Sequence, residues 1–318
     1  MGLYYFIVAV ALVAAAWADE SCPDPESLKP CTCDGEGVNC MAATSLDQIK
    51  KAFQVKFKYG GVRSVWVQGT PITSIPAGLF GSIKSQQFYI EINNVTTVDM
   101  AAFSASKKTL HTLSLFGNKI VEFPFKDLEP FEMLGTLNLG RNKIRSLPDN
   151  AFQSRSLGGI ILAQNDLSHI GRNAFAGLPS LRAIEISGNR LATLGPQSFA
   201  SPRHSASLQI NLASNELSQV DATAFEGLDP YGIYFSSNRL TSLSKEAFSA
   251  LVTKIAQKEG FLELSGNPLS CRGCDYSWLV LNKDLLYTRL YGFTCPDGTG
   301  LMDLTDAKIG CNSRRALF

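Results

Sequence analysis

The chain has 318 residues, of which 45% are hydrophobic and 18% charged, and its formal net charge at pH 7 is +1. A balance this close to neutral argues against nucleic acid as a partner, because nucleic-acid binding requires a strongly basic surface. The length would suit two ordinary domains, but the internal repeats described below favour one elongated domain.

Residues 1–18 are predicted to be a secretory signal peptide. The stretch from Leu3 to Ala16 is apolar throughout, and Ala16-Trp17-Ala18 fits a small-x-small cleavage site, although no Lys or Arg precedes the apolar run. A buried apolar helix is the alternative. Because no later run of about 18 apolar residues occurs, no membrane span is predicted. We therefore expect a secreted, extracellular protein.

Residues 19–61 form the first of two cysteine-rich segments, with Cys22, Cys31, Cys33 and Cys40. In a secreted chain such a group predicts disulfides, and four cysteines allow three pairings. The stretch Ser45–Phe53 predicts a short helix with Ser45 as its N-cap.

Residues 62–267 repeat a phrase of the form L-x-x-L-x-L-x-x-N-x-L, whose clearest copy runs from Leu134 to Ile144. Eight copies carry the Asn, at intervals of 23 to 29 residues, and Thr70 takes its place in a weaker first copy, which makes nine. The Asn positions are Asn93, Asn118, Asn142, Asn165, Asn189, Asn215, Asn238 and Asn267. This period and consensus are the leucine-rich repeat signature.

The residue types of the repeat predict the architecture. Leu137 and Leu139 alternate at the period of a strand with one buried face. Stacked copies bury that face together, so the predicted fold is an α/β solenoid, a leucine-rich repeat horseshoe with a concave parallel sheet. The Asn side chains are expected to form a buried ladder that bonds the turn backbone, and a recurring Phe is expected to fill the opposite side of the core. The Phe column is Phe80, Phe103, Phe152, Phe175, Phe199, Phe225 and Phe248, with Leu128 in the third copy.

Residues 268–318 form the second cysteine-rich segment, with Cys271, Cys274, Cys295 and Cys311. Helical apolar spacing predicts a helix over Trp278–Leu286. A shorter helix is expected in the insertion from Val252 to Gly260. Both cysteine-rich segments are expected to cap the open ends of the solenoid.

The cysteine spacings around the repeats resemble the flanking modules of secreted leucine-rich repeat proteins, and the resemblance covers nearly the whole mature chain. It implies the pairs Cys22–Cys33 and Cys31–Cys40 before the repeats. After them it implies Cys271–Cys295 and Cys274–Cys311. The C-x-x-C spacing at Cys271 departs from the C-x-C that is more frequent in the family.

A narrower resemblance is to the arthropod group of non-catalytic subunits of decapod shrimp luciferases. It rests on the stretches 22–33, 118–125 and 266–280. In that group a separate small subunit performs the chemistry and the repeat subunit supports it. The resemblance therefore implies a non-catalytic binding or scaffold protein that is an accessory subunit of a secreted luciferase-like enzyme complex. An innate immune recognition or cell-adhesion protein is the alternative, and a glycan is the alternative ligand to a protein.

Catalytic chemistry finds no support in the sequence. Zinc at the Cys271-x-x-Cys274 pair would need a second ligand pair at suitable spacing. His111 and Ser114 fall on one predicted strand, but no G-x-S-x-G elbow accompanies them. Walker, G-x-G-x-x-G and H-E-x-x-H motifs do not occur in the sequence. We therefore expect no catalytic residues, no cofactor and no metal, and a function other than catalysis.

The residue between the two Leu of each L-x-L must point away from the core, onto the concave sheet. Nine strands about 4.8 Å apart span on the order of 40 Å, which suffices for an interface of about 800 Å² per partner. The predicted binding face is Trp66, Tyr89, Asn138, Ile161, Glu185, Asn211, Tyr234 and Glu263, with Ser114 in the same column. The alternative is that Trp66, Tyr89 and Tyr234 only cover the sheet. Separately, Asn94-Val-Thr96 is an N-glycosylation triplet and is expected to face solvent.

Overall fold

The computed structural model of the protein describes residues 22–57 and 60–311, so the predicted signal segment lies outside the described residues. The chain forms two compact units, Met1–Asn138 and Leu139–Phe318. The boundary between the units falls inside the fourth copy of the repeat. The sequence, in contrast, predicts one elongated domain. The predicted limits of the cysteine-rich segments, at residues 61 and 268, stay predictions.

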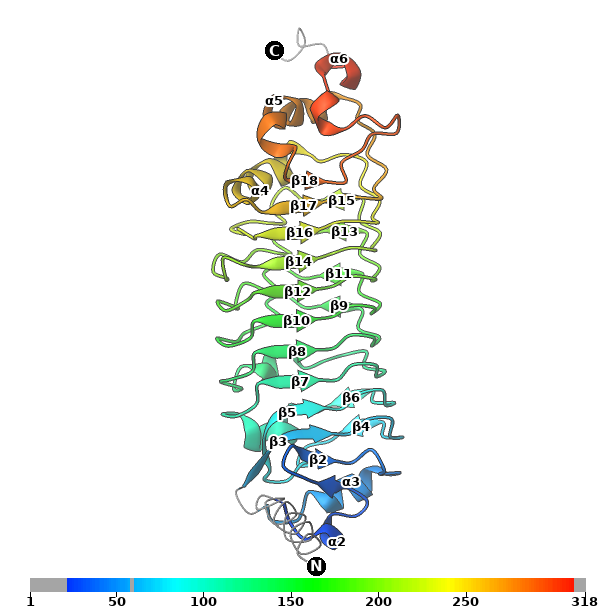
Figure 1. Ribbon diagram of the computed structural model, residues 1–318, viewed down its shortest axis with the longest axis vertical. Helices are drawn as coiled ribbons and strands as arrows, with labels where there is room; N and C mark the ends of the chain where they lie inside the picture. Colours follow the sequence, from blue (N-terminus) through cyan, green and yellow to red (C-terminus); the bar gives the residue numbers. More distant parts are fainter. Residues whose placement is uncertain (1–21, 58–59, 312–318) are drawn as a thin grey trace, which may run out of the picture. The chain divides into compact units, whose positions relative to one another are not determined.

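Unit 1 consists of short strands with few helices (Figure 1). Its elements are α2 (Pro25–Leu28), β1 (Thr32–Cys33), β2 (Gly37–Asn39), α3 (Leu46–Ala52), β3 (Gly61–Trp66), β4 (Ser74–Ile75), β5 (Lys84–Tyr89), β6 (Thr97–Val98), η1 (Met100–Ser106), β7 (Thr112–Ser114), η2 (Phe125–Leu128) and β8 (Thr136–Asn138). The main sheet has the order β1-β2-β3-β5-β7-β8, in which β1 pairs antiparallel with β2 and the later pairs are parallel. The strands β4 and β6 form a small parallel sheet of their own.

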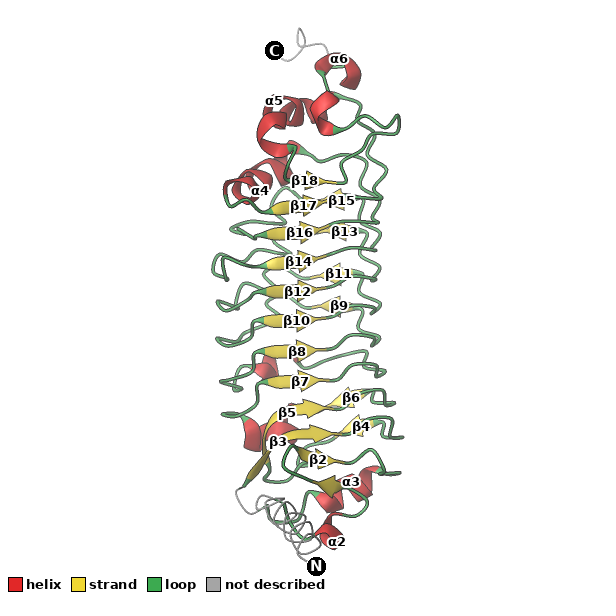
Figure 2. Cartoon of the chain, viewed as in Figure 1, coloured by secondary structure: helices red, strands yellow, loops and turns green. Residues whose placement is uncertain are grey.

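Unit 2 repeats the same plan, and its helices gather near its last strands (Figure 2). Its elements are β9 (Ser146–Leu147), β10 (Gly159–Ile161), β11 (His169–Ile170), β12 (Ala183–Glu185), β13 (Thr193–Leu194), β14 (Gln209–Asn211), β15 (Gln219–Val220), β16 (Gly232–Tyr234), α4 (Lys245–Gln257), β17 (Phe261–Glu263), η3 (Cys274–Tyr276), α5 (Ser277–Leu286), β18 (Leu290–Tyr291), η4 (Leu301–Asp303) and α6 (Asp306–Ile309). The sheet β10-β12-β14-β16-β17-β18 is parallel throughout. Two small parallel sheets, β9 with β11 and β13 with β15, lie beside it.

The predicted leucine core is confirmed in both units. In unit 1, Leu113 on β7 and Leu115 directly after it are fully buried, and in unit 2 Leu162 and Ile186 are fully buried. Each of these side chains removes its apolar surface from water, which stabilises the fold by about 25 cal/mol per Å² buried. One detail differs from the sequence pattern, which centres each strand on the residue between the two Leu of L-x-L: in the structure that residue is the last of its strand. The strands end early because the backbone soon turns left-handed, as at Gln164 with φ of 56°.

The Asn residues form the expected buried ladder. In unit 1, Asn118 Nδ2 donates to the carbonyl oxygens of Ile90 and Leu115, at 2.7 and 2.9 Å, and its Oδ1 accepts from the Val95 N–H at 3.2 Å. Thr70 continues the ladder in the first copy by donating to Asn93 Oδ1 at 2.8 Å. The ladder Asn side chains therefore bond backbone groups of successive turns and help to satisfy polar groups that are buried there.

The Phe column is also buried. Within unit 2 the rings of Phe152, Phe175 and Phe199 stack with centroid separations of 5.6 and 5.3 Å. Aromatic pairs at these separations stabilise the fold by more than the burial of their apolar area alone. The helix expected between Val252 and Gly260 begins earlier, at Lys245. It does so because Phe248, a member of the repeat column, also belongs to the apolar stripe that packs α4 onto the core.

The two cysteine groups form four disulfides. Cys22 pairs with Cys33 and Cys31 with Cys40. In unit 2, Cys271 pairs with Cys295 and Cys274 with Cys311. These are the pairs that the family resemblance implies.

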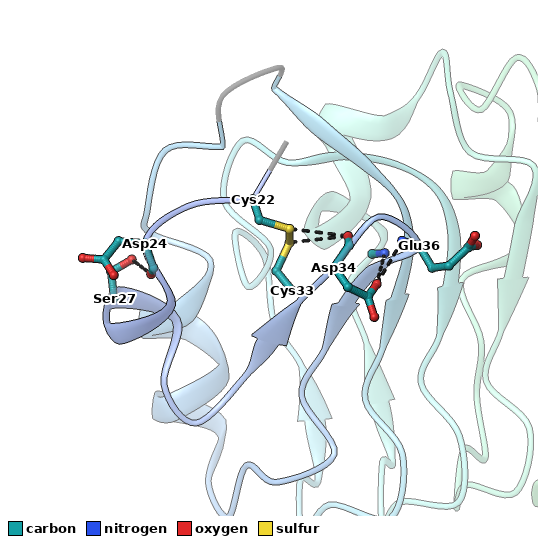
Figure 3. Close-up of a disulfide and its surroundings, with 7 residues drawn as sticks. Cys22, Asp24, Ser27, Cys33, Asp34 and Glu36 are labelled. Atoms are coloured by element: carbon teal, nitrogen blue, oxygen red, sulfur yellow. Dashed lines mark hydrogen bonds between the residues drawn. A yellow bond between two sulfur atoms is a disulfide. The ribbon is translucent and has the colours of Figure 1, made fainter. Parts of the chain in front are cut away.

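Local hydrogen bonds shape the first cysteine-rich segment (Figure 3). Asp34 Oδ1 accepts from the N–H groups of Glu36 and Gly37, at 2.9 and 3.1 Å, which closes the turn between β1 and β2. The carbonyl oxygen of Asp34 lies 3.4 Å from the sulfur of Cys22. Ser45 caps α3 as predicted, since its hydroxyl accepts from the Gln48 N–H at 3.3 Å.

Candidate functional site

The outward face of each sheet is the surface opposite the leucine core. Burial alternates along strands such as β12, where Ile184 is 2% exposed while its neighbour Glu185 is half-buried. This alternation places the predicted column on the outward face. Register brings Trp66, Tyr89, Ser114 and Asn138 into one row in unit 1. In unit 2 it brings together Ile161, Glu185, Asn211, Tyr234 and Glu263.

In the row of unit 1 the aromatic and polar side chains contact one another. The rings of Trp66 and Tyr89 stack at 6.3 Å with an interplanar angle of 9°. Tyr89 Oη donates to Gln87 Oε1 at 3.3 Å, and Ser64 Oγ donates to the same oxygen at 2.9 Å. These contacts agree with the alternative interpretation, in which the two rings cover the sheet.

A carboxylate network continues this row. Glu91 Oε2 accepts from Gln68 Nε2 at 2.7 Å, and Glu91 Oε1 accepts from the hydroxyl of Ser114. Ser114 is 2% exposed, so it offers little surface to a partner. The short side chain of Ser114 is covered because the longer Glu91 reaches across to it.

The row in unit 2 keeps its polar side chains in fixed positions. Asn211 Nδ2 donates to Glu185 Oε2 at 2.8 Å, and Glu185 Oε1 accepts from the Ser187 N–H at 3.0 Å. Glu263 makes the same backbone contact, since its Oε1 accepts from the Ser265 N–H at 2.8 Å. Side chains that are already ordered lose less conformational entropy when a partner binds.

An aromatic cluster lies on the outward face of unit 2, at its last strands. The ring of Phe261 lies 4.9 Å from that of Tyr234, and 6.0 Å from those of both Tyr231 and Tyr291. Phe261 occupies the space that a side chain at Gly232 would need, because a Cβ there would lie 2.5 Å from the ring. Tyr231 and Tyr291 remain 38% and 51% exposed.

Sequence reasoning missed three of these four rings. Phe261 could have been found, because it lies two residues before Glu263 and period-2 alternation puts both on the same face. Tyr291 could not, because β18 lies in the cysteine-rich segment and carries no repeat consensus. Tyr231 precedes its strand, where alternation does not apply.

The histidine and serine weighed for catalysis do not form a dyad. The Ser114 hydroxyl donates to Glu91, and His111 is exposed directly before β7. His204 has a structural role: its Nδ1 donates to the Ser205 carbonyl oxygen at 2.8 Å, and its Nε2 accepts from the Asp229 N–H at 3.0 Å. Among the described residues, no group of three or more His, Cys, Asp or Glu side chains could hold a metal ion.

Two carboxyl groups have clearly lowered pKa values, and both close turns away from the outward face. The Thr223 backbone N–H, with its hydroxyl, lowers the pKa of Asp221. The Thr299 backbone N–H does the same for the pKa of Asp297. Hydrogen bonds to a carboxylate stabilise its charged form, which explains the direction without any catalytic role.

The glycosylation triplet lies on an exposed turn of unit 1. Asn94 is exposed directly after the buried Asn93, and the Thr96 hydroxyl donates to the Thr73 carbonyl oxygen at 3.2 Å. Glycosylation of Asn94 stays a prediction. In the part of the chain that the structure describes, no helix has the length and apolar character required to cross a membrane.

Comparison with known proteins agrees with this architecture. A leucine rich repeat family model matches residues 132–191. The chain is 27% identical over 320 residues to the Oplophorus-luciferin 2-monooxygenase non-catalytic subunit of Oplophorus gracilirostris, and the alignment covers 90% of this chain and 87% of that protein. It is 26% identical over 197 residues to Podocan of Mus musculus, covering 59% of this chain and 30% of Podocan.

A solved structure shows the same fold. It is a chain of the octameric complex of Latrophilin 3, Unc5D and FLRT2, in which FLRT2 is the leucine-rich repeat component. The TM-score is 0.52 at 20% identity, covering 79% of this chain and 83% of that one. These matches show that the chain is similar to leucine-rich repeat proteins, and its repeats and paired cysteines agree with that fold.

Proposed function

We propose that this chain is an extracellular, non-catalytic binding protein whose partner is another protein. Four disulfides support an extracellular location, because such bonds persist in oxidising compartments. The chain is similar along most of its length to a protein that is named a non-catalytic subunit, which favours an accessory role over catalysis. The finer proposal is that the chain is the accessory subunit of a secreted enzyme complex with a small catalytic subunit.

The outward face of unit 2 is the observation that carries this proposal. It combines exposed tyrosine rings with carboxylates that are held in place, and the adjoining positions are small, as at Ala163, Ser187 and Ala213. Tyrosine and tryptophan dominate the energetic centres of interfaces, and small neighbours leave room for a partner to approach. The face of unit 1 is a weaker candidate because its rings stack on each other.

Affinity capture from native extracellular fluid tests the proposal. The mature protein serves as bait, with a Tyr234→Ala variant in parallel and mass spectrometry to identify captured proteins. We expect a small secreted enzyme to be captured by the wild type and depleted with Tyr234→Ala. Capture of a microbial surface molecule or a cell-surface receptor would instead favour the recognition or adhesion role. Substrate turnover by the purified chain alone would contradict the non-catalytic role.

A further inference from the structure

The last three strands of unit 2 place one carboxylate between two tyrosines. Register pairs Tyr234 of β16 with Glu263 of β17, and Glu263 with Tyr291 of β18. Neighbouring strands lie about 4.8 Å apart. All three are last residues of their strands and therefore point to the same outward face. Figure 1 shows β16, β17 and β18 in this order.

Phe261 joins the two tyrosines into one aromatic surface. Its ring meets that of Tyr234 at 69° and that of Tyr291 at 51°, so neither tyrosine ring lies parallel to it. Glu263 cannot swing freely within this surface, because its Oε1 is bonded to the Ser265 N–H. The side chains thus present a fixed negative charge bordered by π-systems.

Among the described residues, Glu263 has no salt-bridge partner. Among the first and last residues of the strands β10, β12, β14, β16 and β17, the charged ones are Glu185 and Glu263. Within the described residues, neither carboxylate takes part in a salt bridge. Arg289 lies beside β17, since its carbonyl oxygen accepts from the Leu262 N–H at 2.8 Å, but its guanidinium donates to the Glu259 carbonyl oxygen at 3.1 Å.

We propose that Glu263, Tyr234, Tyr291 and Phe261 form a subsite for an arginine or lysine side chain of the protein partner. This inference rests on the proposed function. A partner that covers the row must remove water from Glu263, and an apolar or acidic surface would leave that charge buried without compensation. A cationic side chain compensates it and is also attracted to the faces of the flanking rings. Arginine fits better than lysine, because its planar guanidinium can stack on a ring while it donates to the carboxylate.

A matched pair of peptides tests the subsite. The probe is a fluorescently labelled Gly-Ser peptide with three arginines, and its counterpart carries citrulline, which keeps the shape and removes the charge. Binding to the mature protein is measured by fluorescence anisotropy. We expect the arginine peptide to bind about tenfold more tightly than the citrulline peptide, the effect of one compensated charge with ring contact. Equal binding of the two peptides, or no binding of the arginine peptide, would overturn the proposal.

Variants locate the binding. Glu263→Gln should reduce the affinity for the arginine peptide about tenfold, and Tyr291→Ala about fivefold, with Tyr291→Phe close to wild type because the ring is kept. The control is Glu132→Gln, which removes the same charge from an exposed position in unit 1 and should have no effect. A loss with Glu132→Gln as large as that with Glu263→Gln would show that overall charge, and not this subsite, attracts the peptide.

The proposed function and this subsite can fail separately. If the Tyr234→Ala variant captures less partner than the wild type while the peptides bind equally well, the proposed binding face is supported and the proposed cationic subsite is wrong. If the peptides behave as expected but capture is insensitive to Tyr234→Ala and Glu263→Gln, the subsite exists and the proposed role of the face is wrong.

Discussion

Replacing one ladder asparagine tests the physical basis of the fold. Asn189 Nδ2 donates to the carbonyl oxygens of Leu162 and Ile186 at 3.0 and 2.9 Å, and its Oδ1 accepts from the Leu167 N–H at 2.9 Å. Asn189→Ala removes all three bonds and leaves the Leu167 N–H without its partner. The carbonyl oxygens of Leu162 and Ile186 each keep one bond, from the side chains of Asn165 and Asn215. Because Asn189 is only 6% exposed, water can replace that amide only in part.

The expected loss follows from these bonds. A buried polar group without a partner costs about 1–3 kcal/mol. The two lost bonds to carbonyl oxygens add about 0.5–1.5 kcal/mol each, and partial entry of water lowers the sum, so Asn189→Ala should reduce the free energy of unfolding by about 2–4 kcal/mol. Asn189→Asp should lose at least as much at neutral pH. It keeps the acceptor for the Leu167 N–H, but it sets a carboxylate against two carbonyl oxygens.

Urea denaturation followed by circular dichroism measures this loss. The control is Arg190→Ala at the neighbouring position, which breaks an exposed ion pair with Asp166 and should cost about 0–1 kcal/mol. If Asn189→Ala lies within about 0.5 kcal/mol of Arg190→Ala, with unchanged denaturant slope, the ladder does not carry the stability that we assign to it.

Three further predictions concern the modules, the glycan and catalysis. Peptide mapping without reduction should find no free thiol and two disulfides in each cysteine group; a bond between the groups, or one equivalent of zinc per chain, would contradict this. Glycosidase treatment should lower the mass of the secreted protein, and Asn94→Gln should abolish that shift without weakening partner binding; an unchanged mass would show that Asn94 is unmodified. His111→Ala should leave the activity of any associated enzyme near wild type, and loss of turnover in a folded variant would contradict the non-catalytic role.

The repeat could be predicted from the sequence because every copy carries the same pattern of apolar and Asn positions. Alternating residues such as Leu137 and Leu139 determine which face is buried, and the spacing of the Asn determines where the chain turns. The buried Leu columns and the Asn ladder follow from these patterns alone. The outward row follows too, because alternation requires Glu185 and Tyr234 to oppose the core.

What the row presents to solvent was harder to predict, because it depends on side chains that meet across strands. The hydrogen bonds of Glu91 with Gln68 and Ser114 cover part of the row in unit 1, and no single repeat contains both ends of that contact. The contribution of Tyr291 likewise depends on β18, a strand without the repeat consensus. The division between Asn138 and Leu139 has no signal in the sequence, since the fourth copy is the most regular of all.

Binding of the captured partner to surface variants of unit 2 tests the central claim most directly. We expect Tyr234→Ala and Glu185→Lys each to weaken binding by about 1–2 kcal/mol or more, as interface anchors do, without lowering the melting temperature. Arg239→Ala, which changes an exposed ion pair with Glu216 beyond the strand, should leave the dissociation constant unchanged. If Arg239→Ala abolished binding while both face variants bound like wild type, the outward face of unit 2 would not be the binding surface.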